Sequence, residues 1–152
     1  MSLIADIADT LVAELNAASG GGGGAGAGGF SQSFQAERHY LPLFDLEQMK
    51  DLHVTVVPKG MTIQSSGRDR NQHDVQVDVA VQKRFTTGDN AELDPLLTLV
   101  EEIADFFRLR RLASVPAAVW VRTEHAPVYA PEHMEQMRQF TSVITLTYRV
   151  IR

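Results

Sequence analysis

DVQVDVAVQ, residues 74–82, is the most regular stretch of the chain. Successive side chains of a strand point to opposite faces, so this period of two predicts a strand with one buried face and one face in water. The residues expected in the core are Val75, Val77, Val79 and Val81. The residues expected to face solvent are Asp74, Gln76, Asp78 and Gln82. A slip of one residue would bury both aspartates, so the alternation also sets the register.

Other strands are expected on both sides of this segment. Their predicted ranges are 34–41, 53–57, 118–124 and 140–150. Each range is rich in β-branched or aromatic residues, and prolines stand beside several of them. Pro58 is expected to close the second strand, and residues 59–71, which are polar and loop-like apart from Met61-Thr62-Ile63, are expected to form a loop.

Two main helices are predicted. Apolar residues recur at three- and four-residue spacing from Leu3 to about Ala18, and Ser2 is the expected N-cap. The long central helix has its apolar face between Leu93 and Phe107. It is expected to begin at Asp94, which precedes a proline, or one turn earlier at Asn90. Short helices are predicted over 45–51 and from about residue 131.

These elements predict an α+β fold. We expect one mixed, mostly antiparallel, four- to five-stranded sheet, covered by the N-terminal helix and the long central helix. The chain, residues 1–152, is expected to form a single domain. Residues 20–29 contain only glycine and alanine, and they are predicted to be a flexible loop.

Composition excludes several classes of protein. The chain has 152 residues and no cysteine, which rules out a disulfide scaffold, a thiol nucleophile and a cysteine-based zinc finger. A net charge of −5 argues against bulk attraction to nucleic acid. No apolar run approaches the roughly 18 residues that cross a membrane. No basic segment precedes the first apolar residues, so we expect no signal peptide and a soluble intracellular protein.

The sequence contains no convincing catalytic motif. Gly24, Gly26 and Gly29 have dinucleotide-site spacing, but they follow a helix where that site needs a strand. There is no phosphate-binding loop, no nucleophile elbow and no helical pair of metal-binding histidines. We therefore predict that the protein is not an enzyme and has no cofactor and no metal site.

Some residues are candidates for contacts with other proteins. Leu99 and Phe106 widen the apolar arc of the long helix on one side, so that helix needs a second covering surface. Either the first helix or a neighbouring subunit could supply it. The candidate subunit-interface residues are Leu99, Phe106, Arg108 and Arg110. A second candidate, a docking loop for a partner protein, contains Arg68 and Arg70.

Several segments together match the pattern of a known family. They are the first helix with Ile4, Ile7, Leu11 and Leu15, YLP at 40–42, HVTVVP at 53–58, DVAVQK at 78–83, residues 93–104, PVYAPEH at 127–133 and FTSVITLTY at 140–148. Over residues 3–150 the chain resembles the tail terminator proteins of tailed phages. These small proteins form a ring that caps the tail tube.

The resemblance implies a structural protein of a siphophage virion, located in the tail or neck and assembled in the host cytoplasm. It implies a homo-oligomer, expected to be a hexameric ring, that stops tube polymerisation. The implied partners are the tail tube protein and the head–tail connector protein. DNA would pass through without specific binding, and the face with Asp74, Gln76, Asp78 and Gln82 would line the lumen. The alternatives are another neck or tail component, such as a head-closure or tail-tube protein, and a small ligand-binding domain.

Overall fold

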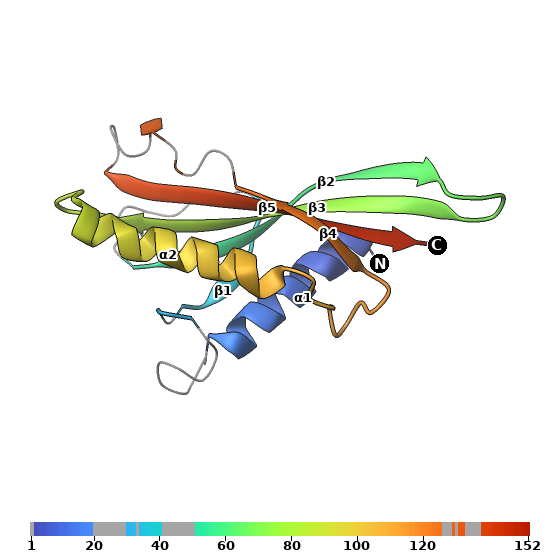
Figure 1. Ribbon diagram of the computed structural model, residues 1–152, viewed down its shortest axis with the longest axis horizontal. Helices are drawn as coiled ribbons and strands as arrows, with labels where there is room; N and C mark the ends of the chain where they lie inside the picture. Colours follow the sequence, from blue (N-terminus) through green and yellow to red (C-terminus); the bar gives the residue numbers. More distant parts are fainter. Residues whose placement is uncertain are drawn as a thin grey trace.

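The computed structural model has an α+β fold, as the sequence predicts. It describes residues 2–19, 30–32, 34–40, 51–125, 129, 131–132 and 138–152. The elements are α1 (Leu3–Ala18), β1 (Ala36–Arg38), β2 (His53–Ser65), β3 (Asn71–Arg84), α2 (Asn90–Phe107), β4 (Val119–Glu124) and β5 (Gln139–Ile151). Both helices cover the same face of one sheet, and the β2–β3 hairpin extends to one end of the molecule (Figure 1).

The sheet has five strands in the order β1-β2-β3-β5-β4. β1 runs parallel to β2, and every other neighbouring pair is antiparallel. β3 lies in the middle, with Val79 opposite Val56 of β2 and Ile144 of β5. The sheet is therefore mixed and mostly antiparallel, which confirms the fold class.

The core lies between the sheet and the helices. The four valines of β3 are buried there, as predicted, with exposures of 0–1%. α1 packs mainly against β1, β2 and β3, whereas α2 packs against β5. The central strand thus contributes one complete apolar face, and the helices cover it without help from another chain.

α1 is fastened at both ends by polar contacts. Ser2 caps its start, since the Ser2 hydroxyl accepts a hydrogen bond from the Ala5 amide at 3.4 Å. Near its end, the Asn16 side chain makes two hydrogen bonds with the backbone of Ala36, at 2.6 and 3.1 Å. These bonds hold α1 against β1. The cap at Ser2 and the observed range Leu3–Ala18 confirm the predicted N-cap and helix range.

The predicted loop at 59–71 is wrong for most of its length. β2 continues through Pro58 to Ser65, and β3 begins already at Asn71. A register shift between Pro58 and Gly60 absorbs the proline, which strands tolerate at bulges and edges. The hairpin is therefore much longer than its polar sequence indicated.

The start of α2 is the earlier of the two predicted positions. Asp89 is the N-cap, and Pro95 lies inside the helix. Glu92 accepts hydrogen bonds from the backbone amides of Thr86, Thr87 and Gly88 at 2.7–3.1 Å. With the Thr87 hydroxyl as the strongest contributor, these donors lower the pKa of Glu92 to about 2. Asp94 is consequently not the cap.

Other predicted elements are shorter or not described. The strand predicted over 34–41 is confined to Ala36–Arg38 within the described residues. The flexible loop at 20–29 and nearly all of the short helix at 45–51 lie outside the described residues, as does most of the segment 127–133. Neither α1 nor α2 is long and apolar enough to cross a membrane.

Candidate functional surface on the open face of the sheet

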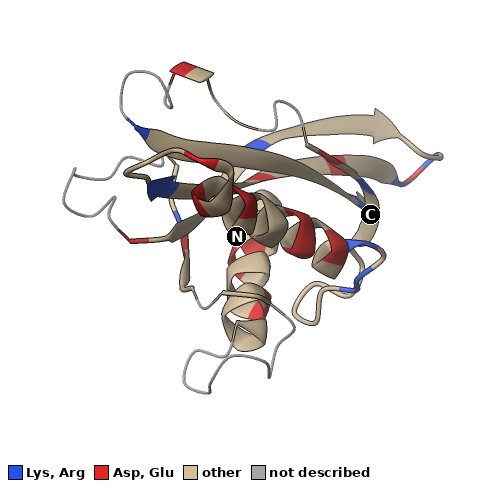
Figure 2. Ribbon diagram, turned by 60° about the vertical axis from the view of Figure 1, so that its left-hand side comes forward, with Lys and Arg blue, Asp and Glu red and all other residues tan. Residues whose placement is uncertain are grey.

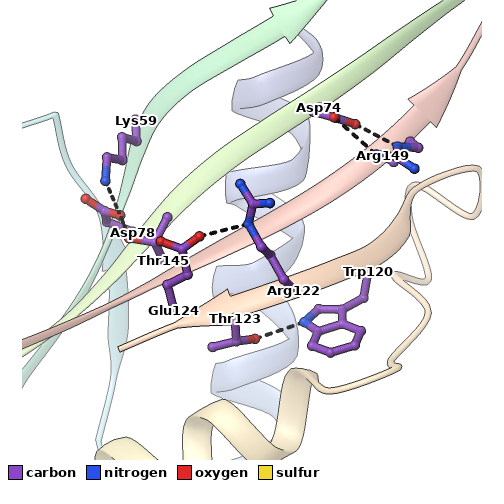
Figure 3. Close-up of polar contacts among 9 residues, drawn as sticks. All are labelled: Lys59, Asp74, Asp78, Trp120, Arg122, Thr123, Glu124, Thr145 and Arg149. Atoms are coloured by element: carbon purple, nitrogen blue, oxygen red, sulfur yellow. Dashed lines mark hydrogen bonds and ion pairs between the residues drawn. The ribbon is translucent and has the colours of Figure 1, made fainter. Parts of the chain in front are cut away.

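The sheet face that the helices leave uncovered is polar, and we call it the open face. Its members are Lys59 on β2, Asp74, Gln76 and Asp78 on β3, Thr145, Thr147 and Arg149 on β5, and Arg122 and Glu124 on β4. Strand alternation places them there, because their neighbours along each strand enter the core. Figure 3 shows most of these side chains on one side of the strands.

Asp74 is held by a double contact with Arg149. The guanidinium donates from Nε at 2.9 Å and from Nη2 at 3.3 Å, and Gln72 donates a further bond at 3.3 Å. The Arg149 hydrogen bond is the main reason why the pKa of Asp74 lies below its usual range. The same pairing raises the pKa of Arg149. Both groups remain charged at neutral pH.

Asp78 has two partners on the neighbouring strands. The Thr145 hydroxyl donates a hydrogen bond to Asp78 Oδ1 at 2.6 Å, and Lys59 Nζ lies 3.9 Å from the same oxygen. On β4, Arg122 Nε lies 2.8 Å from Glu124 Oε1. Each carboxylate of the open face is therefore matched by a base, and the face carries no local excess of negative charge (Figure 3).

The open face is not uniformly wet. The Asp74 and Asp78 side chains are 23% and 24% exposed, so both reach solvent. Gln82 is only 3% exposed, so the prediction that it faces solvent is wrong. Alternation decides only the side to which a residue points. At Gln82 that side is buried, as it also is at Thr55 and Thr141 nearby.

The helix layer contrasts with the open face in charge. Figure 2 shows Asp and Glu along α2 and α1, whereas Lys and Arg gather at strand ends and in the connections. Glu101 and Asp105 are exposed on α2, and α2 has no basic residue in its last turn. The acidic surplus of the chain therefore lies partly on the helices, and the open face is charge-balanced.

The predicted interface residues fall into two groups. Leu99 is 0% exposed and belongs to the core of its own chain, so it is unavailable to a neighbouring subunit. Phe106 is half-buried, with its ring centroid 5.3 Å from that of Phe30. The Arg110 guanidinium lies 4.1 Å from the Phe106 centroid and 3.5 Å from Glu14. The apolar surplus of α2 is thus largely covered within the chain.

The remaining candidates are exposed. Arg108 caps the C-terminal end of α2 and is exposed, together with Leu109, which is 78% exposed. Arg68 and Arg70 lie at the tip of the β2–β3 hairpin, and both are exposed. Arg108 and Leu109 belong to the connection between α2 and β4, whereas Arg68 and Arg70 belong to the turn between β2 and β3.

The described residues offer little for catalysis. They contain no group of three or more residues of the metal-binding types that could hold an ion. The Tyr148 hydroxyl is buried without a hydrogen-bond partner. Desolvation, followed by the nearby Glu14 carboxylate, raises the pKa of this phenol, so it stays neutral at physiological pH. One described serine lies beside a histidine, since His125 Nε2 is 2.7 Å from Ser142 Oγ, but Ser142 is 0% exposed and its hydroxyl is therefore closed to a substrate from solvent.

Some members of the open face were missed at the sequence level. The alternation of the last strand separates Thr145, Thr147 and Arg149 from the core residues, so the signal for their side was present. Their pairing with the aspartates depends on β3 lying beside β5, which alternation does not specify. Lys59 was missed because its segment was predicted to be a loop.

The fold and this surface define a class: a two-layer α+β domain with a polar, charge-balanced sheet face. Among solved structures, its fold is similar to the PVC sheath/tube terminator of an extracellular contractile injection system, determined in the extended state by cryo-electron microscopy. The likeness covers 100% of this chain and 57% of that one, with a TM-score of 0.50 and 15% sequence identity. No protein-family model matches the sequence. No curated protein matches it either.

Proposed function

We propose that the protein is a tail terminator. Copies of the chain form a hexameric ring on the end of a phage tail tube, stop its polymerisation and join it to the head–tail connector. The observation that carries this proposal is the likeness of the entire chain to a sheath/tube terminator. It agrees with the family resemblance of the sequence over residues 3–150. The role is structural, without turnover of a substrate, in the tail or neck of the virion.

In this proposal the open face lines the channel of the ring. A channel that passes DNA must not hold the phosphates, and unpaired bases would do so with a steep dependence on salt. On the open face, Arg149 is engaged by Asp74, and Lys59 lies beside Asp78. These pairings support a lining over which DNA moves without being gripped.

The contacts with partners are assigned to the exposed arginines. Arg68 and Arg70, at the hairpin tip, are proposed to dock on the tube or the connector. Arg108 and Arg110, with the half-buried Phe106, are proposed to belong to the subunit contact. Leu99 is excluded from that contact by its burial.

The test is to measure the mass of the purified protein alone and with tail tubes, and to image the tubes by electron microscopy. A ring of six copies at one end of each tube, with tube growth arrested, is the expected result. If the protein alone polymerises into long tubes, it is a tail-tube protein. If it binds only the connector and never the tube, it is a head-closure protein. Either outcome overturns the terminator assignment.

A further inference from the structure

Among the described residues, the outer half of β2 has a strand on one side only. β1 pairs only with Val54–Val56, so the backbone from Val57 to Ser65 has no strand on its outer side within the described residues. We call this segment the β2 edge. Met61 and Ile63 project from it with 43% and 54% of their surfaces exposed. Natural edge strands are usually protected by charges, prolines or bulges. Beyond the bulge at Gly60 the edge carries neither a charge nor a proline up to Ser65.

The opposite border of the sheet is β4. It pairs with β5 on one side only, and within the described residues no strand lies on its other side. Its sequence, VWVRTE, is rich in residues that favour strands. Val119 is 62% exposed at its beginning. In the part of the chain that the structure describes, the sheet therefore has a free edge on each border.

The two edges lie at the same height in the sheet. Thr62 of β2 pairs with Asp74, Asp74 with Arg149, and Arg149 with Val119 of β4. At the other end, Val57 is linked in the same way through Asp78 and Thr145 to Glu124. A second copy placed beside the first without a shift along the strands would therefore set its β4 against the β2 edge.

Strand direction fits the same arrangement. β2, β3, β5 and β4 alternate in direction, since each neighbouring pair among them is antiparallel. β4 of a second copy would consequently run antiparallel to β2, and the alternation would continue across the junction. Backbone hydrogen bonds of an antiparallel ladder would then satisfy the donors and acceptors that both edges leave open.

The charges at the junction are complementary. Without a shift, Glu124 of the second copy would lie opposite Val57, two residues from Lys59. Lys59 and Glu124 both project from the open face, and their side chains are 51% and 59% exposed. Such diagonal neighbours lie within reach of long side chains. An opposite-charge contact therefore accompanies the backbone pairing.

We infer that successive copies join edge to edge, with the β2 edge of one copy pairing antiparallel with β4 of the next. This inference rests on the proposed ring and names the contact that builds it. A junction between two different surfaces generates a closed ring when its rotation closes. The sheet would run continuously around that ring, with the open face on one side throughout and the helices on the other.

Engineered disulfides test the junction, because the natural chain has no cysteine. Thr62 and Val119 both lie on the open-face side, at matching height. Directly opposite residues of paired strands have Cβ atoms about 5 Å apart, close to the reach of a disulfide. We expect the double variant Thr62→Cys/Val119→Cys, oxidised after assembly, to give covalent multimers up to the full ring. A mixture of the two single variants should give dimers only.

Two further sets of cysteine variants test the register of the junction and the background level of cross-linking. Gly60→Cys and Gln64→Cys, each with Val119→Cys, shift the first cysteine by two residues on the same face. Of the three pairs, the pair whose two cysteines lie directly opposite each other should cross-link best. Glu101 is exposed on α2, away from both edges, so Thr62→Cys/Glu101→Cys should show only background cross-linking.

Lysine substitutions on the β2 edge test the junction without cross-linking, through the mass of the assembly. Met61→Lys/Ile63→Lys places two lysines on the β2 edge, where both side chains are already exposed, so the monomer should keep its melting temperature. The mass of the assembly should fall to that of the monomer. Glu101→Lys/Asp105→Lys, on the exposed side of α2, should leave the mass unchanged.

The outcomes separate this inference from the proposed function. Assembly on tubes with cross-linking at background level for all three pairs overturns the edge-to-edge junction and leaves the terminator function standing. Cross-linked multimers that do not cap tubes support the junction and overturn the function. A protein that stays monomeric with and without tubes overturns both.

Discussion

The two faces of β3 consist of alternating residues of one strand, yet they are stabilised in different ways. On the covered face, Val75, Val77 and Val79 are 0% exposed, and the helices of the same chain complete their packing. On the open face, Asp74 and Asp78 stay about a quarter exposed and are paired with bases from other strands. The covered face therefore determines whether the chain folds, while the open face can be altered with less effect on folding.

The strongest test of this comparison is Val79→Asp. It places a carboxylate between Val56 and Ile144, at a position that is 0% exposed, so the free energy of unfolding should fall by at least about 4–5 kcal/mol. Gln76→Asp introduces the same side chain on the other face of the same strand and should cost under about 1 kcal/mol. Urea unfolding followed by circular dichroism measures both. Equal losses would contradict the division between the faces.

The second test concerns the helix layer over the covered face. Phe106→Ala removes a ring that contacts Phe30 and carries Arg110 on its face. Because the ring is half-buried, we expect a loss of about 2–3 kcal/mol in unfolding free energy, less than the roughly 3–5 kcal/mol typical of a fully buried aromatic ring. Phe106→Leu should recover most of it. Should Phe106→Ala leave the melting temperature unchanged, the ring would have no packing role within the monomer.

A third, smaller effect is expected from the Asp74–Arg149 pair. The folded pKa of Asp74 lies below its unfolded value, so the pair stabilises the fold above the unfolded pKa. That stability is lost as pH falls through the folded pKa. Asp74→Asn should therefore lower the melting temperature at pH 7, by the equivalent of about 1 kcal/mol for a partly exposed pair. The difference from the natural protein should shrink below about pH 4. A difference independent of pH would show that ionisation is not its cause.

The same contrast explains what could be predicted from the sequence. The covered face of β3 was predictable because period two appears directly in the order of the residues. Gln82 was misplaced, since alternation gives the side of a residue but not what covers that side. The pairing of Asp74 with Arg149 joins residues far apart in the chain, and a single sequence does not specify such pairings.

Two local errors had different causes. Residues 59–65 are polar or small apart from Met61 and Ile63, which are largely exposed, and their strand is held by backbone bonds to β3. By contrast, the observed start of α2, at Asn90, was one of the two predicted positions, but it was placed second. Asp89 and Glu92 have the D-x-x-E spacing of a capping box. The prediction preferred Asp94 as the N-cap because a proline follows it.

The last prediction, with the smallest effect on folding, is Asp78→Lys. It removes the acceptor of the Thr145 hydroxyl and puts a second cation beside Lys59, on a face that is otherwise charge-balanced. Because Asp78 reaches solvent, the new side chain can extend into water. We therefore expect a loss of roughly 1 kcal/mol or less, with no change in assembly. If the open face lines the channel of a phage tail, as proposed, the unpaired cations should hold DNA phosphates and slow ejection most at low salt. Asp78→Asn removes the same charge without adding a cation, so it leaves only Lys59 unpaired and should slow ejection less than Asp78→Lys does. Normal ejection by intact Asp78→Lys particles would show that the open face does not line the channel. Unfolding of the variant would show that the open face is as necessary for folding as the buried valines are.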